Sequence, residues 1–599
     1  MKAEAMSFTF IGNEGLVKIP FFQRGYVWDI TNWEDILDDL LDFHKSHFLG
    51  SLILKQQEKQ TGKPKEVLVI DGQQRLTTLS ILLRAIYNSF DEETQSNCDA
   101  VLKNYLFYKK NQTDKNYWVK IEHSKIDKHY FQKVIKNEIS SSEYDEIVVR
   151  NPQTKISSKH NKILQCYKYF SEKIKEVDFD KRVALFNRLL DQENKILVVI
   201  DLSEKEDEQA IFDTINSAGI RLSSADIIKN ALFQRALDVH DQEDEVMALY
   251  RENWEAIFSA DDETILFWDT PRSTGRLMRD NIEILLHAIA VIKGFFDPDK
   301  HTLSELSSLY KTHISKNSKE ELTQFIKEIT RFAKLYREKI VVFHTSTLFN
   351  FYDSPTRLFH ILSVCEITTF HPYILSLFFQ YEHNEIKLIE ELHKLETLVV
   401  RRMIAKTETK SYNKLCKEFI KNNAFVEEKN NEISEEEIKN GLYNIGNKNA
   451  TLLLFWIELY RRANDKKQSV KELKYNYSLE HIMPQKWEQY WSTIPVVDAL
   501  GNIIVNVEHA KQERYAKIYE IGNMTLLNSS LNTSLRNYEF HRKINGEQRK
   551  KGIKDYSDLG ITRFDLVIPF ENGDTIWNEQ KIRKRTIALT NDILEIWSI

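Results

Sequence analysis

The stretch from Val67 to Ile86 constrains the fold most, because an apolar run passes through a glycine turn directly into a helical pattern. Val67–Ile70 has the length and composition of a buried strand. From Gln73 onward, apolar residues recur at every third or fourth position, which is typical of a buried helix face. These residues are Leu76, Leu79, Leu82, Leu83 and Ile86. The sequence therefore predicts a strand, a tight turn at Asp71–Gly72 and a helix, as in an α+β domain.

The turn at Asp71–Gly72 is also a candidate anion site. Backbone N–H groups and the positive end of a helix dipole converge where a helix follows a glycine turn. Arg75 would add a forked cation suited to phosphate, and Asp71 would hold a metal ion or a water molecule. Upstream, Gln23 and Arg24 lie in a loop that can reach the same anion. We expect a nucleotide phosphate here, although an ordinary turn and a surface loop over packed aromatic side chains explain the same residues.

Three further segments belong to the predicted first domain. Thr31 and Glu34 fit a capping box at the start of a helix. Phe48–Leu54 and Leu197–Leu202 have the composition of short strands. These elements extend the α+β pattern around the glycine turn.

The segment from Glu206 to Lys229 is predicted to contain a helix, a turn at Asn216 and a second helix. Ser223 fits the cap of the second helix, with Asp226 at its third position. On spacing alone, helix caps and a surface lysine explain Asn216, Asp226 and Lys229.

Length and composition exclude several classes of protein. A chain of 599 residues is too long for one core, so several domains are expected. A charged content of 29% and a mean hydropathy of −0.45 favour a water-soluble protein, and no run approaches the length of a membrane helix. The first residues lack the apolar segment of a signal peptide. Four well-separated cysteines without a C-x-x-C pair indicate a reducing cytoplasm and argue against a zinc ribbon.

From about residue 236 to residue 470 the apolar spacing is helical almost throughout. No repeat of fixed period is visible in this region. The basic pair Arg401 and Arg402 follows an apolar run and would fit either a helix terminus or a DNA contact. We expect a helical connector that carries a substrate-sensing surface.

A second polar site lies near the C-terminus. Glu480 and His481 belong to an E-H-x-x-P element, and Asn523 begins a Gly-Asn-x-Thr-Leu-Leu segment. A lone His-x-x-Pro turn is more often a core or capping histidine. Here a basic stretch follows, because residues 534–554 hold seven Lys or Arg against two Glu. Within it, Arg542 and Lys543 are candidates for contact with a phosphate backbone, and a solvated helix face is the alternative.

Together these motifs resemble the GmrSD-type family of modification-dependent, type IV restriction endonucleases. The resemblance rests on Ile19–Trp28, Phe48–Leu54, Ile70–Leu79, Ile211–Asn230 and the two C-terminal motifs. That family joins a ParB/sulfiredoxin-like NTPase domain to an HNH nuclease domain. In the family the first loop commonly reads Tyr-Gln-Arg, whereas Phe22 replaces the tyrosine here.

The resemblance implies roles for the residues of the second site. His481 would deprotonate the attacking water, and the amide of Asn523 would hold its imidazole. Glu480 and Asn532 would bind the divalent ion, Mg²⁺ or Mn²⁺, with Asn528 as a less favoured alternative to Asn532.

The resemblance also implies a nucleoside triphosphate, GTP or another, in the first domain. The residues expected to bind it are Gln23, Arg24, Asp71, Gly72, Gln73, Gln74, Arg75, Asn216, Asp226 and Lys229.

The predicted fold is multidomain and mainly α, with α+β ends. Residues 1–235 form a ParB/sulfiredoxin-like domain, 236–400 a helical connector, and 401–599 a helical region that contains a ββα-metal (HNH) motif at about 475–550. The expected function is cleavage of double-stranded, modified phage DNA under nucleotide control, in the cytoplasm and away from membranes, with a homodimer as a further expectation. The alternatives are a nucleotide-switched DNA-binding protein with an inactive nuclease domain, and a nonspecific toxin nuclease.

Overall fold

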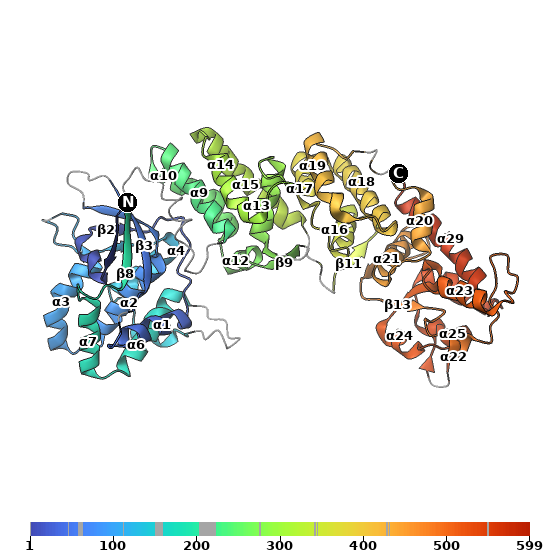
Figure 1. Cartoon of the computed structure of the whole chain (residues 1–599), viewed down its shortest axis with the longest axis horizontal. Coiled ribbons are helices and arrows are strands. Elements are labelled where there is room, and N and C mark those ends of the chain that lie inside the picture. The colour runs from blue at the N-terminus through green and yellow to red at the C-terminus, as the bar shows by residue number, and fades with distance from the viewer. Residues whose placement is uncertain are drawn as a thin grey trace. The chain divides into compact units, whose positions relative to one another are not determined.

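The computed structural model describes residues 2–599 except 46, 58–63, 112, 150–159, 203–222, 275–276, 341–342, 344–345, 427–428, 430–431 and 548–549. The chain divides into two compact units, Met1–Tyr250 and Arg251–Ile599. Figure 1 labels their elements, which are predominantly helices. The predicted helix at 206–216 and the predicted turn at Asn216 lie outside the described residues.

The first unit is built on a mixed sheet of six strands in the order β1-β8-β3-β4-β2-β7. β3 runs parallel to β8 and antiparallel to β4, and β2 runs parallel to β4 and β7. The predicted strands at 48–54, 67–70 and 197–202 are all present. The strand bounds are β1 Lys2–Met6, β2 Leu16–Lys18, β3 Gly50–Gln56, β4 Glu66–Asp71, β7 Ile121–Glu122 and β8 Leu197–Leu202.

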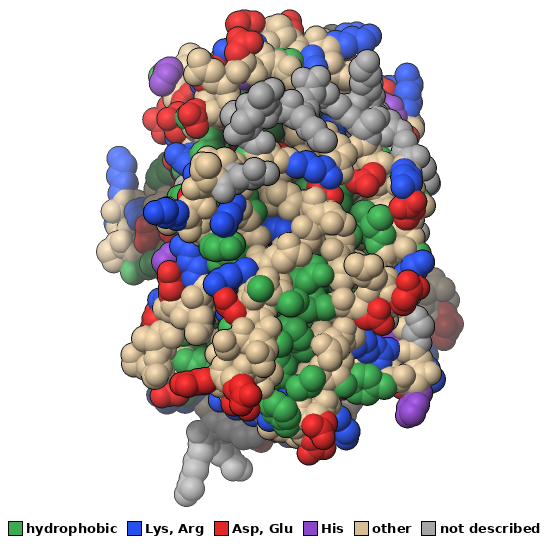
Figure 2. Space-filling model, turned by 90° about the vertical axis from the view of Figure 1, so that its left-hand side faces the viewer, with side chains coloured by type: hydrophobic (Ala, Val, Ile, Leu, Met, Phe, Trp, Pro, Cys, Tyr) green, Lys and Arg blue, Asp and Glu red, His purple; other side chains and the backbone are tan. Residues whose placement is uncertain are grey.

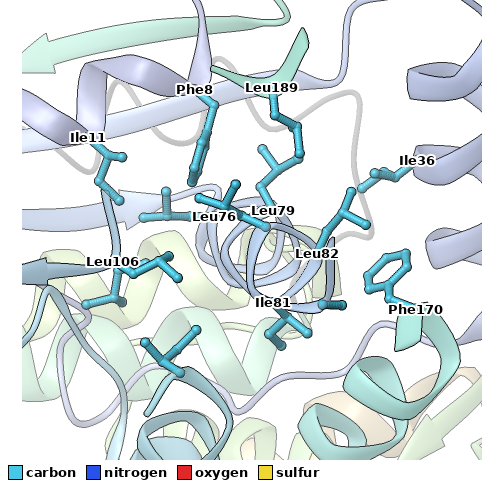
Figure 3. Close-up of a cluster of buried hydrophobic side chains, with 14 of the residues drawn as sticks. Phe8, Ile11, Ile36, Leu76, Leu79, Ile81, Leu82, Leu106, Phe170 and Leu189 are labelled. Carbon is cyan, nitrogen blue, oxygen red and sulfur yellow. The ribbon is translucent and has the colours of Figure 1, made fainter. Parts of the chain in front are cut away.

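The helix that follows β4, α2 (Gln73–Asn88), is the centre of the first core. The sequence predicts one buried face, but nearly every residue from Gln73 to Ile86 is buried. Figure 3 shows why: neighbouring elements supply apolar side chains such as Phe8, Leu106 and Phe170 around the helix. The buried hydroxyl groups of Thr77 and Ser80 donate to carbonyls one turn earlier, so burial leaves them bonded.

Eight other α-helices, a 3-10 helix at Phe8–Asn13 and a short hairpin complete the described part of the first unit. The predicted capping box at Thr31 and Glu34 is wrong: α1 begins at Ile30, and its cap is Asp29 with Asn32 as the reciprocal partner. The helices are α1 Ile30–Leu41, α3 Glu92–Leu106, α4 Lys125–Ile135, α5 Ser141–Glu146, α6 Lys162–Lys175, α7 Phe179–Leu189, α9 Ser224–Val239 and α10 Glu243–Tyr250, and the hairpin strands are β5 Phe107–Tyr108 and β6 Trp118–Val119.

The first part of the second unit is helical, as predicted from its apolar spacing. Arg401 and Arg402 end α18 and are buried, where they bond to carbonyl groups and to Glu432. This favours the helix-terminus interpretation of the basic pair. The main helices are α12 Asp262–Trp268, α13 Asn281–Ile292, α14 Leu306–Ile314, α15 Lys319–Lys339, α16 Ser354–Val364, α17 His371–Gln380, α18 Glu385–Ile404, α19 Tyr412–Asn422, α20 Glu435–Leu442 and α21 Asn447–Asn464. The short strands are β9 Pro271–Thr274, β10 Leu277–Asp280, β11 Leu348–Asn350 and β12 Glu472–Lys474.

The last part of the second unit carries the second motif on a two-stranded sheet. β13 (Ser478–His481) pairs antiparallel with β14 (Met524–Leu527). α24 (Ser529–Leu535) follows β14, so the local order is strand, strand, helix. The remaining elements are α22 Glu488–Trp491, α23 Val507–Ile518, α25 Phe540–Asn545, β15 Gly546–Glu547, β16 Lys550–Lys551, α26 Ile553–Tyr556, α27 Gly560–Thr562, α28 Ile568–Glu571 and α29 Glu579–Ile596.

The predicted domain boundaries at 235 and 400 fall inside α9 and α18, whereas the compact units meet at Tyr250 and Arg251. The division into three functional parts stays a prediction. Within the described residues, no helix is both long enough and apolar enough to cross a membrane.

Candidate functional site

His481 ends β13, and its imidazole is oriented by a backbone carbonyl. Nδ1 lies 3.1 Å from the carbonyl oxygen of Ile518 at the end of α23. Because a carbonyl only accepts hydrogen bonds, Nδ1 must carry a proton. Burial lowers the pKa of His481, which favours a neutral ring with its lone pair on Nε2. The exposed side-chain amide of Asn447 lies 3.3 Å from Nε2. Because Nε2 carries the lone pair, the amide nitrogen of Asn447, and not its oxygen, is the group that can bond to it.

Asn523 is fully buried and fixes the turn beside His481. Its side-chain oxygen accepts from the N–H of Met483 at 2.8 Å and from Nε1 of Trp577 at 3.2 Å. Its amide nitrogen donates to the carbonyls of Met483 and Ile518, at 2.8 and 3.1 Å. The Asn523 amide thus bonds to the same carbonyl that accepts the hydrogen bond from His481. It does not bond to the imidazole itself, contrary to what the resemblance implies.

Glu480 lies beside His481 on β13, and its carboxylate forms an ion pair with a buried lysine. The Nζ of Lys543 donates to Glu480 Oε1 at 2.5 Å and to the His481 carbonyl at 2.8 Å. Burial raises the pKa of Glu480 and lowers that of Lys543, while their mutual contact opposes both shifts. Lys543 has no exposed surface, so in this structure it does not present its charge to a DNA backbone as the sequence predicts.

The other predicted residues of this site lie on the neighbouring helices. The Asn532 amide nitrogen on α24 donates to the Leu479 carbonyl at 2.8 Å, one residue before Glu480. Asn528, the alternative ligand, is exposed at the start of α24 and makes no capping bond. Arg542 is partly exposed on α25, stacked 3.4 Å from the centroid of the Tyr538 ring. Arg542 is therefore the better placed of the two predicted DNA contacts.

The donors around Glu480 fit a divalent ion that is completed by substrate. Among the described residues there is no group of three or more His, Cys, Asp or Glu able to hold a metal. Glu480 is the carboxylate donor, and the second ligand that the resemblance implies, Asn532, is tied by its amide nitrogen to the carbonyl of the residue before Glu480, which leaves its amide oxygen for an ion. Mg²⁺ is commonly bound by one or two carboxylates together with water and substrate phosphate. These residues therefore fit a Mg²⁺ or Mn²⁺ site that shares Glu480 with Lys543.

At the first motif, three glutamines tie the 20–28 loop to β4 and α2. Gln23 donates to the Val69 carbonyl at 2.8 Å, and Gln73 donates to the Arg24 carbonyl at 3.0 Å. Gln74 accepts from the Val27 N–H at 2.8 Å and donates to the Gly25 carbonyl at 3.2 Å. The amide groups of all three side chains are thus used to shape the loop.

Arg75 has a similar bracing role. Its Nε donates to the Leu49 carbonyl at 2.8 Å, and Nη1 donates to the Ser51 carbonyl at 3.2 Å. A Cβ on Gly50 would meet the Arg75 guanidinium at 2.3 Å, so glycine is required for this approach. The guanidinium therefore holds the start of β3, and fewer of its N–H groups are left to bind a phosphate.

Charged residues from distant parts of the chain gather at the N-terminus of α2. Burial raises the pKa of Asp71, although Gly72 N–H, Arg75 and Arg24 oppose the shift. Asp226 on α9 bonds to Lys229 Nζ at 3.0 Å. Burial would raise the pKa of Asp226, but Lys229, its cap Ser223 and Arg24 outweigh this effect and lower it.

Two features of this region suit a ligand. Gly72, at φ +90°, precedes α2, whose first turn carries no side-chain cap. Oε1 of the buried Gln73 has no hydrogen-bond partner among the described residues. The site thus offers an uncapped helix N-terminus for an anion and an acceptor for a hydroxyl or amino group. The structure brings nine of the predicted residues to this region, and Asn216 lies outside the described residues.

Some contributors carry no signal in the sequence. Asn447 lies 34 residues before His481 along the chain. The Ile518 carbonyl lies only five residues before Asn523, but a backbone acceptor leaves no trace in residue type. The burial of Lys543 could have been predicted from its helical spacing, although its charge suggests an exposed position. Lys543 shares a helix face with Phe540 and Ile544, both buried, at the spacing of a core face.

Two segments of the chain, one near each end, match models of known protein families. Residues 7–233 match the family model described as GmrSD restriction endonuclease, N-terminal domain. Residues 427–592 match the model described as GmrSD restriction endonucleases, C-terminal domain. An uncharacterized protein of Methanocaldococcus jannaschii is 26% identical over 246 residues, a match that spans 36% of this chain and 39% of that protein. Both candidate sites lie within the two matched segments.

Proposed function

Because the chain belongs to the GmrSD family of restriction endonucleases, we propose that it is a modification-dependent endonuclease of anti-phage defence. It cuts phosphodiester bonds of DNA at an HNH-type site around His481. The first unit has a ParB/sulfiredoxin-like fold, binds and hydrolyses a nucleoside triphosphate, and regulates cleavage. The strand–strand–helix order at β13, β14 and α24 supports the HNH assignment.

The orientation of His481 carries this proposal. Its Nδ1–H is held by the Ile518 carbonyl, and burial favours the neutral ring, so Nε2 is available to take a proton from water. Asn523 donates to the same carbonyl and fixes its position. Lys543 bonds to both the Glu480 carboxylate and the His481 carbonyl, which sets the end of β13 in place.

Glu480 and Asn532 would hold the divalent ion, Mg²⁺ or Mn²⁺. When bound, such an ion stabilises the charge that develops on the phosphate and the leaving oxygen. Arg542, partly exposed on α25, is placed to contact the DNA backbone.

Cleavage assays with the full chain test the proposal. Phage DNAs that differ only in base or backbone modification are incubated with Mg²⁺, with and without each nucleoside triphosphate. Wild type should nick modified DNA, and His481→Ala should be slower by roughly a hundredfold or more. His541→Ala is the matched control, because His541 is exposed on the nearby helix α25.

Two outcomes of this assay favour the alternatives. Unchanged nicking by His481→Ala would favour a nucleotide-switched DNA-binding protein with an inactive nuclease site. The contact of Lys543 with Glu480 supports that alternative, since it places a cation on the proposed metal ligand. Equal cutting of plain and modified DNA, or of RNA, would favour a nonspecific toxin nuclease.

The nucleotide site has a separate test. Lys229 is buried beside Asp226, within the charged group at the N-terminus of α2. Lys229→Met should weaken binding of GTP or ATP by roughly tenfold or more in isothermal titration, since a buried cation near phosphate is lost. Lys195→Met, at an exposed position before β8, should bind as wild type does. Failure of every triphosphate to bind wild type would contradict the NTPase assignment. A homodimer and a cytoplasmic location stay predictions.

A further inference from the structure

The β5–β6 hairpin of the first unit forms one wall of an open pocket of about 710 Å³. Tyr108 and Trp118 are directly opposite each other on the two strands, so their side chains share one face of the hairpin. Both line the pocket, together with residues from the β2–β7 edge of the sheet and from α4. These residues include Leu16, Lys18, Glu122, Lys128 and Gln132, and Glu66 at the start of β4 also lines the pocket.

The indole of Trp118 is held in place although 42% of the residue is exposed. Its Nε1 donates to Asp114 Oδ2 at 3.1 Å, which fixes the ring orientation. The Nζ of Lys110 lies 3.9 Å from the ring centroid. The Lys110 ammonium thus lies over the indole face. A nucleobase that stacks on this exposed, oriented ring would displace the ammonium from the face towards its own phosphate.

The rest of the pocket carries charges of both signs. Lys128 pairs with Glu122 at 2.5 Å, and Lys18 pairs with Glu243 at 3.0 Å. Gln132 and Glu66 add an amide and a further carboxylate. A site for bare phosphate would have no use for carboxylates, whereas the amino groups of a nucleobase donate to them. Figure 2 shows that acidic and basic side chains are also mixed on the face that it presents.

We propose that this pocket receives one nucleotide of a DNA strand, extruded from the duplex. Its base stacks on Trp118, Lys110 contacts its phosphate, and the polar groups of the opposite wall contact the base edge. The volume is in the range of pockets for ligands of nucleotide size. The inference rests on the proposed function in so far as DNA is the substrate, and it assigns recognition of the strand to residues outside both motifs.

The test is fluorescence anisotropy with a labelled duplex, the same duplex with one mismatch, and the single strand, in a chelator that prevents cleavage. An unpaired base costs less to extrude, so wild type should bind the mismatched duplex and the single strand more tightly than the paired duplex. Trp118→Ala should weaken those two complexes roughly tenfold or more and remove the preference, and Trp118→Phe should keep most of it.

Tyr117→Ala is the matched control. Tyr117 is the neighbouring residue, is 44% exposed, and has Lys103 and Lys109 beside its ring, but it does not line the pocket. It should bind all three DNAs as wild type does. An equal loss for Tyr117→Ala would show a general surface effect and overturn the pocket assignment. Tight binding by Trp118→Ala would overturn it as well.

Two further outcomes separate this inference from the proposed function. If wild type binds none of the DNAs, the proposal of a DNA endonuclease fails together with the pocket. If wild type binds DNA independently of Trp118 but binds the free mononucleotide dCMP only with Trp118 intact, the pocket serves free nucleotides. In that case the proposed function survives and the DNA part of this inference fails.

Discussion

Asn523 and His481 show how a single backbone oxygen organises two side chains. Both bond to the carbonyl of Ile518, so the asparagine acts on the imidazole through the main chain. The residue types of the motif were sufficient to predict that these side chains lie together. They were not sufficient to predict the contact, because the intermediary is a carbonyl that any residue would supply.

Asn523→Ala should therefore impair both stability and cleavage. It leaves the N–H of Met483 and Nε1 of Trp577 without their acceptor in a buried site, at a cost of about 3 kcal/mol. It also removes one of the two donors that fix the Ile518 carbonyl, so nicking should slow although Asn523 touches no substrate. Urea denaturation and a nicking assay measure the two effects. Ser530→Ala, an exposed change on the same segment, should alter neither. Wild-type stability of Asn523→Ala would contradict the proposed bracing.

The largest difference between the prediction from residue type and the structure concerns the exposure of Lys543. A lysine in a basic stretch after a nuclease-like motif was expected to contact DNA, but the helix face that it occupies is the buried one. Helical periodicity decided its position, and burial next to Glu480 supplied the compensating charge. Charge alone did not distinguish Lys543 from its exposed neighbours.

At the scale of elements, the Lys543–Glu480 pair joins α25 to β13. Lys543→Met would leave the Glu480 carboxylate buried without its partner, which typically costs about 3–5 kcal/mol. Amide hydrogen exchange of β13 in the full chain should become roughly a hundredfold faster or more. Lys554→Met is the control, since Lys554 is half-buried and its ammonium bonds to the neutral amide oxygen of Asn545 at 2.7 Å. Unchanged protection of β13 would mean that this pair does not hold the strand.

The turn between β4 and α2 was the best predicted element. Two separate physical reasons require glycine at position 72. Gly72 has φ +90°, and a Cβ there would lie 2.2 Å from Leu52 Cδ2. Gly294 has a similar φ of +79° but no atom within 4 Å of the added Cβ. The strand, turn and helix were predictable because local periodicity and glycine chemistry agree. The burial of α2 on nearly all sides was not, since it depends on elements distant in sequence.

The two glycines allow the contributions to be measured separately. Gly294→Ala should cost about 1 kcal/mol from backbone strain alone. Gly72→Ala should cost more, about 2–4 kcal/mol, because it adds a steric clash with β3 to the same strain. Thermal denaturation measures the loss of stability in each variant, and hydrogen exchange around each glycine shows where the loss occurs. Equal losses would mean that the clash is relieved by a small movement of Leu52.

At the scale of the whole molecule, several histidines are buried in the neutral form. Burial lowers the pKa of His123 and His287 to about 3, and that of His360 and His371 to about 4. They occur in both units, so both should lose stability in acid. The sequence identifies these histidines but not their burial, because none belongs to a motif.

His360 gives the cleanest test of this acid sensitivity. Its ordinary pKa is 6.5 and its folded pKa is about 4, so the unfolded chain takes up the proton first as the pH falls. Its stabilising contribution, about 3 kcal/mol, is complete above pH 6.5 and is lost between 6.5 and 4. His360→Phe, within an aromatic cluster that includes Phe349 and Trp456, should show a smaller fall in melting temperature over this range. His383→Phe, at an exposed position, should keep the wild-type pH dependence.

The side chains of Gln23, Gln73, Gln74 and Arg75 bond to main-chain groups of the loop at residues 20–28, of β4 and of the start of β3. A genetic screen for loss of the anti-phage defence proposed above would therefore recover substitutions at Gln23, Gln74 or Arg75 because they weaken the fold and not because they remove a ligand contact. Such alleles should be temperature-sensitive and rescued by low growth temperature, whereas an allele that removes a ligand contact should be dead at every temperature.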